Sequence, residues 1–261
     1  LKALGRIHDA AQAVQAAHTA RAAGFHNFNL DLMFGLPGQT PEQAVNDLMA
    51  AIELHPSHLS WYQLTLEPNT LFAAHPPTLP DDEQKWEMQH LGQALCTRSG
   101  YIQYEVSAFA RNGKTCDHNQ NYWQFGDYIG IGAGAHGKIT DAGKGAIRRT
   151  WKARHPAAYL DTDHAAGAMD GQRELNESEA VFEFALNRLR LTKPFTFNEF
   201  EACCGLERGW ITPLIRHAHT DGLLYFDGEQ VQHTAKGWLF LNDLLERFLP
   251  EVNQDARNRA D

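Results

Sequence analysis

Residues 28–40 read FNLDLMFGLPGQT, and this stretch gives the clearest indication of the fold. Apolar and more polar residues alternate along it, which predicts a β-strand with two different faces. One face carries Phe28, Leu30, Leu32 and Phe34. The other face carries Asn29, Asp31 and Met33. The GLPGQT segment then predicts a turn into a helix, because Thr40 and Gln43 can form a capping box around Pro41.

The segments around this strand alternate between predicted helix and predicted strand. Helices are expected over residues 9–23, 40–55 and 81–98, and strands over residues 59–66 and 101–109. Such alternation is typical of βαβ units and predicts a parallel sheet. In a closed barrel built from these units, the apolar face of residues 28–34 packs against helices, and Asp31 points toward the inside.

Composition and charge narrow the classes of function. The chain has 261 residues, a formal net charge of −9 and a pI of about 5.8. Because binding through counterion release needs a basic face, we expect no nucleic-acid partner. No apolar run has membrane-spanning length, no signal peptide is recognisable, and four cysteines do not make a disulfide framework. We therefore expect a cytoplasmic protein without a membrane span; peripheral membrane contact and the oligomeric state stay open.

The pattern changes after about residue 174. Three helices are predicted over residues 174–191, 196–205 and 209–222, then a hairpin over 223–234 with Asp227 and Gly228 at its turn, and a last helix over 235–249. The first of these helices has Phe182, Ala185, Leu186 and Leu189 on one face. Three helices and a hairpin predict a winged-helix-like module, and its acidic surface favours a packing or partner role over DNA reading.

Residues 116–138, CDHNQNYWQFGDYIGIGAGAHGK, hold the second group of candidate site residues. A packed turn is the ordinary interpretation of Cys116, His118 and Asn119. Tyr122 and Trp123 would alternatively offer a stacking surface for a flat ligand, and His118 could ligate its iron axially. Cys116 is the competing ligand, and a zinc site is disfavoured because no second ligand pair has the required spacing.

The glycines that follow resemble the letters of a dinucleotide-binding loop. We reject that interpretation because residues 141–150, DAGKGAIRRT, are polar and turn-like and do not continue as a long apolar helix. Gly130, Gly132 and Gly134 instead indicate close backbone approach, either to a ligand or to another strand.

Asp31 and Arg6 are the remaining candidates. A carboxylate inside a strand needs a partner, and a structural hydrogen bond is one explanation. The adjacent GLPG turn favours a ligand contact, since active sites of α/β barrels lie at the carboxyl ends of the strands. Arg6 would match a ligand carboxylate.

Together, these motifs resemble one family. LKALGRIH, FNLDLMFGLPGQT, LSWYQLTLEPNTLF, LPDD, the CxHNxxYW segment and GDYIGIGAGAHGK are similar to the haem-chaperone branch of the radical S-adenosylmethionine proteins, related to oxygen-independent coproporphyrinogen III oxidase. The resemblance implies an α/β fold: an incomplete radical-SAM (β/α) barrel over residues 1–170, a small HemN-type C-terminal domain over 171–250, and a disordered tail over 251–261.

The resemblance also implies ligands and a function. Arg6 and Asp31 match positions that contact S-adenosylmethionine, and His118 matches the proposed haem-iron ligand, with Asn119, Tyr122 and Trp123 completing the haem motif. The expected function is haem binding and delivery to apo-haemoproteins, with a [4Fe–4S] cluster in the intact protein. The alternative is oxidative decarboxylation of coproporphyrinogen III.

The cluster motif itself is missing from this sequence. No cysteines have the CxxxCxxC spacing, and the chain starts at Leu1 in what reads as a loop entering a helix. We therefore expect the C-terminal two-thirds of such a protein, without enzymatic turnover of its own.

Overall fold

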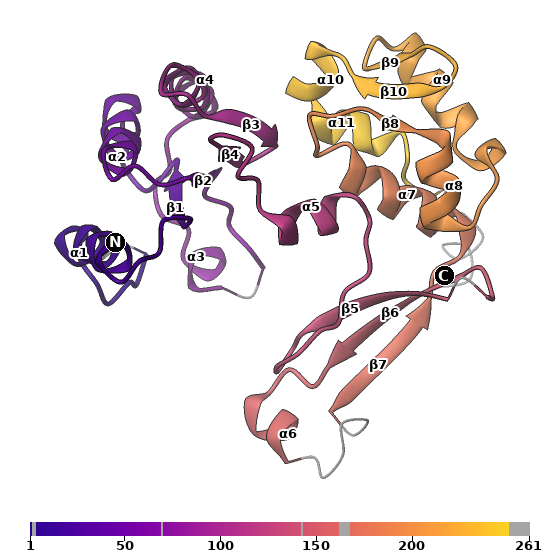
Figure 1. The fold of residues 1–261 in the computed structure, drawn as a ribbon, viewed down its shortest axis with the longest axis horizontal. Helices are drawn as coiled ribbons and strands as arrows, with labels where there is room; N and C mark the ends of the chain where they lie inside the picture. Colours follow the sequence, from indigo (N-terminus) through magenta and orange to yellow (C-terminus); the bar gives the residue numbers. More distant parts are fainter. Residues whose placement is uncertain (2–3, 69, 142, 162–167, 251–261) are drawn as a thin grey trace. The chain divides into compact units, whose positions relative to one another are not determined.

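The computed structural model describes residues 1, 4–68, 70–141, 143–161 and 168–250. The chain forms two compact units, residues 1–116 and residues 117–261 (Figure 1). The predicted tail over residues 251–261 lies outside the described residues.

The first unit is built on a four-stranded sheet with the order β1-β2-β4-β3. Its strands are β1 (Asn29–Phe34), β2 (His58–Gln63), β3 (Ile102–Glu105) and β4 (Ala108–Ala110). Strands β1 and β2 are parallel, as predicted, and β4 runs antiparallel to both of its neighbours. The prediction of a wholly parallel sheet is therefore wrong. Residues 101–109 were expected to form one strand, but the chain reverses between β3 and β4, and the sheet becomes mixed.

The helices of this unit begin where the local sequence can cap them. They are α1 (Ala10–Ala22), α2 (Pro41–Glu53), the short α3 (Leu71–Ala74) and α4 (Asp82–Arg98). Capping boxes at Asp9, Thr40 and Asp81 satisfy the free N–H groups of the first turns of α1, α2 and α4. These three helix starts were all predicted from the sequence.

The apolar face of β1 packs against helices, as the alternation predicted. Phe34 is buried, and Leu30 and Leu32 pack beside it against a core formed with α2, β2 and α4. The core consists of Phe34, Ala44, Leu48, Ala51, Leu59, Trp61, Met88, Cys96, Tyr101 and Phe109. Asn29 and Asp31 lie on the opposite, exposed face of β1.

The second unit begins with a helix that the sequence interpretation missed, α5 (Asp117–Trp123). A three-stranded antiparallel sheet follows, formed by β5 (His136–Asp141), β6 (Ala146–Lys152) and β7 (Met169–Glu174), with α6 (Pro156–Leu160) between the last two (Figure 1). The polar segment after the glycines is thus a β-hairpin. This agrees with the rejection of a dinucleotide fold, because strand β5 and not a helix comes directly after the glycines.

The rest of the second unit is mainly helical. Its helices are α7 (Glu177–Arg188), α8 (Phe197–Cys204), the 3-10 helix η1 (Arg208–Trp210), α9 (Thr212–Thr220), α10 (Ala235–Leu239) and α11 (Leu241–Glu246). A small antiparallel sheet with the order β8-β10-β9 contains β8 (Phe195–Thr196), β9 (Leu224–Phe226) and β10 (Gln230–His233). The hairpin turn holds Asp227 and Gly228, as predicted, and Gly228 has φ of +104°.

Two helix predictions need correction. The buried face of α7 is formed by Val181, Phe184, Ala185 and Arg188, whereas Leu186 is exposed. Phe184 makes edge-to-face contacts with Phe195 and Phe200, so tertiary packing and not the local stripe selects the face. Residues 235–249 do not form one helix, because Phe240 leaves helical geometry between α10 and α11.

The core of the second unit joins distant parts of its sequence. Phe125 and Ile147 pack in the same cluster as the buried residues of α7, α8, α9 and α11. The segment that contains α5 and β6 is therefore anchored to the C-terminal helices. The predicted domain boundary at residues 170 and 171 stays a prediction, because sharing a core does not decide where one domain family ends.

Candidate functional site

A cavity of about 860 Å³ opens in the first unit beside the exposed face of β1. This volume is within the range of small-molecule sites in proteins. Its lining comes from the first residues of the chain, α1, β1 and α2, together with Tyr62. The polar lining residues are Arg6, His8, Asp9, Asp31, Asp47 and Tyr62. The apolar ones include Leu1, Leu4, Val14, Met33 and Leu36.

Arg6 and Asp31 line this same cavity, although 25 positions separate them in the sequence. Arg6 follows a turn in which Gly5 adopts φ of +67°. Asp31 accepts a hydrogen bond of 2.9 Å from Asn29 Nδ2 on its own strand. A guanidinium and a carboxylate on one cavity wall can bind a ligand that carries both an acid group and hydroxyl groups. Their ligand roles stay predictions.

A polar network lies beneath Asp31, and the sequence interpretation missed it. His58 begins β2 and is paired in register with Asn29. Its Nδ1 lies 2.7 Å from Asn29 Oδ1, and its Nε2 lies 2.8 Å from the Tyr104 hydroxyl. His58 is only 5% exposed, and burial lowers its pKa, an effect that the charge of Asp31 opposes. The neutral imidazole therefore connects the cavity wall to β3.

Helix α5 carries the second group of candidate residues. His118 and Tyr122 are one helical turn apart, and their ring centroids are 4.8 Å apart. The Tyr122 ring also stacks on Tyr128 at 4.1 Å. His118 is exposed, whereas Tyr122 is half-buried; burial, followed by the neighbouring Tyr128, raises the pKa of Tyr122. An exposed imidazole beside stacked aromatic rings can ligate the metal at the centre of a flat ligand from one face.

Trp123 and Asn119 lie differently from His118. The guanidinium carbon of Arg190 is 4.3 Å from the centre of the Trp123 ring, so a cation covers one face of the indole. The indole Nε1 is buried and makes no hydrogen bond within the part of the chain that the structure describes. Asn119 is half-buried. The structure therefore brings His118 and Tyr122 together, whereas the Trp123 ring lies against Arg190, which follows α7.

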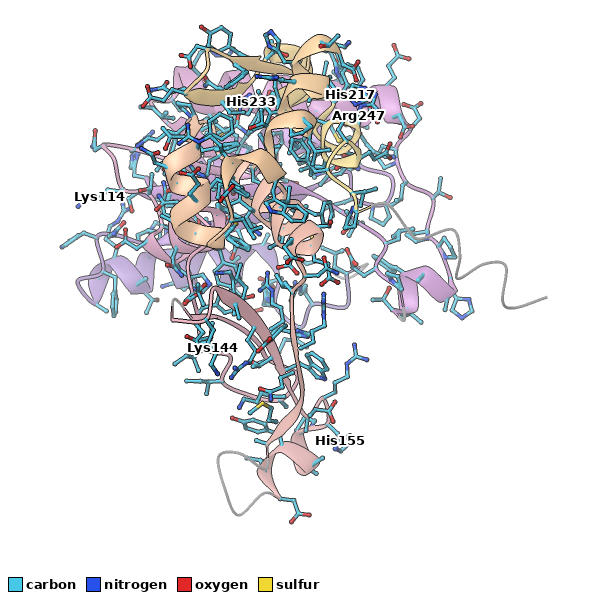
Figure 2. The ribbon with its side chains drawn as sticks, turned by 90° about the vertical axis from the view of Figure 1, so that its right-hand side faces the viewer. Lys114, Lys144, His155, His217, His233 and Arg247 are labelled. Carbon is cyan, nitrogen blue, oxygen red and sulfur yellow. The ribbon has the colours of Figure 1, made fainter. Side chains whose placement is uncertain are left out.

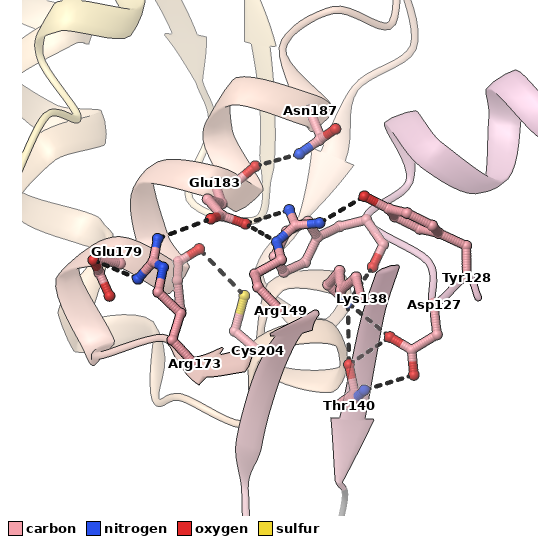
Figure 3. Close-up of polar contacts among 12 residues, drawn as sticks. Asp127, Tyr128, Lys138, Thr140, Arg149, Arg173, Glu179, Glu183, Asn187 and Cys204 are labelled. Carbon is pink, nitrogen blue, oxygen red and sulfur yellow. Dashed lines mark hydrogen bonds and ion pairs between the residues drawn. The ribbon is translucent and has the colours of Figure 1, made fainter. Parts of the chain in front are cut away.

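Ion pairs hold the segment after α5 in place (Figure 3). Arg149 on β6 donates to the Tyr128 hydroxyl at 2.8 Å and also pairs with Glu183 on α7. Lys138, only 1% exposed, donates to Asp127 at 2.9 Å. Burial would raise the pKa of Asp127, but hydrogen bonds from Lys138 and Thr140 lower it overall.

The glycine segment contacts protein backbone. A Cβ atom on Gly130 would collide with the carbonyl of His136, in line with the bridge between Tyr128 and Lys138. Gly132 and Gly134 adopt φ of +109° and +70°, a region that favours glycine. Of the two alternatives for close approach, another strand explains Gly130. A ligand contact at Gly132 and Gly134 stays a prediction.

Cys96 and His217 have local explanations. Cys96 is buried, and burial raises its pKa to about 12, which makes it a poor thiolate ligand. His217 lies near Arg247 because both contact Asp221 (Figure 2). Across the described ranges, no three His, Cys, Asp or Glu side chains form a group that could hold a metal ion. Within the same ranges, no helix has the length and apolar character needed to cross a membrane.

Comparisons with known proteins reveal relatives of this chain. The chain is 49% identical to the haem chaperone HemW of Escherichia coli over 96% of its length, and 47% identical to HemW of Haemophilus influenzae over the same share. The chain is homologous to HemW. It spans 65% of the length of the E. coli HemW and 64% of the H. influenzae HemW.

Two further comparisons agree with the HemW relationship. Residues 175–240 match the model of the HemN C-terminal domain. The solved structure of coproporphyrinogen III oxidase (HemN) from E. coli, described as a radical SAM enzyme, superposes with a TM-score of 0.75. That match covers 96% of this chain and 61% of HemN at 22% identity, so it shows the shared fold alone.

Proposed function

We propose that this chain binds haem and delivers it to apo-haemoproteins, with S-adenosylmethionine as a second ligand. The homology to proteins named haem chaperones, at 47–49% identity over 96% of the chain, carries this proposal. Haem is the cargo in this scheme, and a cytoplasmic location is part of the proposal. The acceptor is an apo-haemoprotein that needs an iron porphyrin from a carrier.

The geometry of α5 supports a haem site at His118. Its imidazole is exposed and is backed by Tyr122 and Tyr128. A porphyrin ligated there could extend over Tyr122, whose ring is fixed by its stack on Tyr128. Arg149, which is paired with Glu183, donates to the Tyr128 hydroxyl and so fixes this ring (Figure 3). This arrangement would reduce the entropy lost when a flat ligand binds.

The cavity beside β1 supports a site for S-adenosylmethionine. Arg6 would hold the carboxylate of the ligand, and Asp31 would accept from its ribose hydroxyls. S-adenosylmethionine supplies a sulfonium centre when it is bound. A [4Fe–4S] cluster does not fit the cysteines of this chain, because none has the CxxxCxxC spacing and Cys96 and Cys204 are buried. No chemistry through a cluster is assigned to these residues.

Haem titration tests the proposal. Replacing His118 with Ala should lower haem affinity by at least about tenfold, because even residues that only orient a metal ligand typically contribute that much. The Soret absorption band reports both affinity and ligation. His155→Ala is the matched control, since His155 is another exposed histidine of the second unit, at the start of α6 (Figure 2). Equal haem affinity in wild type and His118→Ala would show that His118 does not ligate the haem iron.

Cys116 is the competing iron ligand and needs its own variant. Cys116→Ser should leave the Soret spectrum unchanged if His118 binds the iron. A spectrum that changes in Cys116→Ser and not in His118→Ala would assign the ligand to the thiolate.

A second candidate function is the decarboxylation of coproporphyrinogen III. The fold shared with HemN favours it, although at 22% identity this likeness does not extend to activity. Anaerobic assay for protoporphyrinogen formation separates the two functions. We expect no turnover by this chain, and robust turnover would favour decarboxylation over haem delivery as its function.

At the level of domains, we infer that residues 1–170 belong to an incomplete radical-SAM barrel and that residues 171–250 form a HemN-type, winged-helix-like domain. Helix-strand alternation around the parallel pair β1 and β2 supports the first inference. The small sheet beside α7, α8 and α9 supports the second.

A further inference from the structure

Five residues of the first unit form a continuous chain of hydrogen bonds. The Cys116 amide lies 3.3 Å from the Tyr104 hydroxyl, and that hydroxyl lies 2.8 Å from His58 Nε2. His58 Nδ1 lies 2.7 Å from Asn29 Oδ1, and Asn29 Nδ2 lies 2.9 Å from Asp31 Oδ1. The chain thus runs from the residue directly before α5, across β3 and β2, to the cavity wall on β1.

Every bond in this series has one consistent direction. Asn29 can donate to the Asp31 carboxylate only through its amide nitrogen, so its oxygen must accept from His58 Nδ1–H. His58 Nε2 then has a lone pair and accepts from the Tyr104 hydroxyl. The Tyr104 oxygen in turn accepts from the Cys116 N–H. The tautomer of His58 follows from this network, and burial, which lowers the pKa of His58, favours the same neutral form.

Asp31 is the end of this series that meets solvent. Within the described residues, Asn29 is its one hydrogen-bond donor, so carboxylate oxygen is left for a ligand in the cavity. A ligand hydroxyl that donates to Asp31 withdraws electron density and weakens the bond from Asn29. Because linked hydrogen bonds polarise one another, the change passes through the part-buried bond at Asn29 to His58 and on to the buried bond between His58 and Tyr104.

We propose that His58 and Tyr104 are positioning residues that couple a ligand bound at Asp31 to the backbone at Cys116. The ligand is one with donor hydroxyls, such as the ribose of S-adenosylmethionine, and this part rests on the proposed function. Cys116 is bonded to the first residue of α5, so the same coupling reaches the helix that carries His118. By linkage, a ligand at α5 changes the affinity at Asp31 by the same factor.

Two buried tyrosines give a matched pair of variants. Tyr104→Phe removes the hydroxyl that links His58 to Cys116. Tyr101→Phe removes a hydroxyl that donates to the Pro56 carbonyl at 2.7 Å, outside the series. The two tyrosines are 6% and 2% exposed, and three positions separate them, so each variant removes one buried hydroxyl. Tyr104→Phe removes the two hydrogen bonds of the series, whereas Tyr101→Phe removes a hydrogen bond outside it. His58→Phe is a second break, at the centre of the series.

The first experiment needs no haem. S-adenosylmethionine is titrated into the full chain while ¹⁵N NMR follows the His58 ring nitrogens and the Cys116 amide. In wild type and Tyr101→Phe, we expect both signals to shift at the same ligand concentration. In Tyr104→Phe, the His58 signals should still shift, while the Cys116 amide should not. A Cys116 amide that stays constant in wild type, or still shifts in Tyr104→Phe or His58→Phe, would overturn the coupling.

The second experiment measures the coupling between ligands. Haem affinity is determined from the Soret band with and without saturating S-adenosylmethionine. We expect the affinity to change at least about fivefold in wild type, and about equally in Tyr101→Phe, but to be independent of S-adenosylmethionine in Tyr104→Phe. Equal coupling in both variants would overturn the proposal. Absence of haem binding in wild type would instead contradict the proposed function, while the NMR result would stand on its own.

Discussion

At the scale of single residues, the buried His58 of the first unit shows how the surroundings of one side chain change its pKa. The His58 ring is hydrogen-bonded to Asn29 and Tyr104 and has no carboxylate as a direct hydrogen-bond partner among the described residues. Burial lowers its pKa from the ordinary 6.5, and the more distant charge of Asp31 only partly offsets this effect. A protonated His58 would also prevent the Tyr104 hydroxyl from donating to Nε2.

This arrangement predicts a defined pH dependence of stability. Because the pKa of His58 is lower in the folded chain than in the unfolded one, the unfolded chain binds more protons below pH 6.5. The free energy of unfolding should therefore fall as the pH drops from 6.5 toward the pKa of the folded state, and this contribution should then level off. Urea unfolding of wild type and His58→Asn at about pH 8 and pH 5 measures it.

Between about pH 8 and pH 5, the free energy of unfolding should fall less for His58→Asn than for wild type, whatever the stability of the variant at pH 8. His217→Asn is the control, because His217 is an exposed histidine on α9. An identical pH dependence in wild type and His58→Asn would show that His58 does not carry this proton linkage.

Sequence reasoning proposed Asp31 and Arg6, which line the cavity, but did not single out His58 and Tyr104. Asp31 is recognisable because a carboxylate interrupts an apolar alternation next to a glycine-rich turn. His58 becomes interpretable only once β1 and β2 are paired, with Asn29 opposite it. Tyr104 falls within the single strand predicted over residues 101–109, and that prediction gives no hydrogen-bond partner for its hydroxyl. Partners across strands depend on register, which one sequence does not specify here.

Helix starts were the elements best predicted from the sequence. The capping boxes at Thr40, Asp81 and Asp9 depend on residues three positions apart, so local sequence is sufficient. The reversal between β3 and β4 was missed because its turn, Val106 and Ser107, contains neither glycine nor proline. Helix α5 was missed because its seven residues show no apolar stripe.

Packing between α4 and β2 explains why a glycine, a poor helix former, lies inside α4. Gly92 lies in the interior of α4, where alanine would favour the helix by about 1 kcal/mol. A Cβ at this position would overlap the ring of Trp61 on β2, which is only 3% exposed. We expect Gly92→Ala to lower the free energy of unfolding by about 1–3 kcal/mol, since overpacking exceeds the gain in propensity. Thermal or urea unfolding measures the loss.

A second substitution distinguishes overpacking from other causes. Trp61→Leu provides space next to α4, so adding Gly92→Ala to that variant should cost much less than adding it to wild type. Thr97→Ala, at an exposed position of α4, is the control for helix propensity and should be neutral or slightly stabilising. If Gly92→Ala cost the same in both backgrounds, contact with Trp61 would not be the cause.

On the scale of the whole molecule, the two units have separate hydrophobic cores. The core of the first unit draws its residues from positions 34–109, and the larger core of the second from positions 125–248. Buried phenylalanines dominate the second core, with Phe184 in contact with Phe125, Phe195 and Phe200. Each such side chain contributes roughly 1.5–3 kcal/mol when fully buried. Because α5 is tied to this core through Phe125, the helix that carries His118 belongs energetically to the second unit.

Residues 117–261 expressed alone should therefore fold cooperatively. We expect a single sigmoidal urea transition and a dispersed ¹⁵N NMR spectrum, because all members of the Phe125–Phe248 core are present in this piece. Phe184→Ala should destabilise the piece by about 3–5 kcal/mol, as expected for a large buried aromatic, and should destabilise the same residues to a similar extent in the full chain. A piece that lacks a cooperative transition, or a Phe184→Ala cost confined to the full chain, would show that the second core depends on residues before Asp117. In that case the His118 helix could not be analysed apart from the cavity of the first unit.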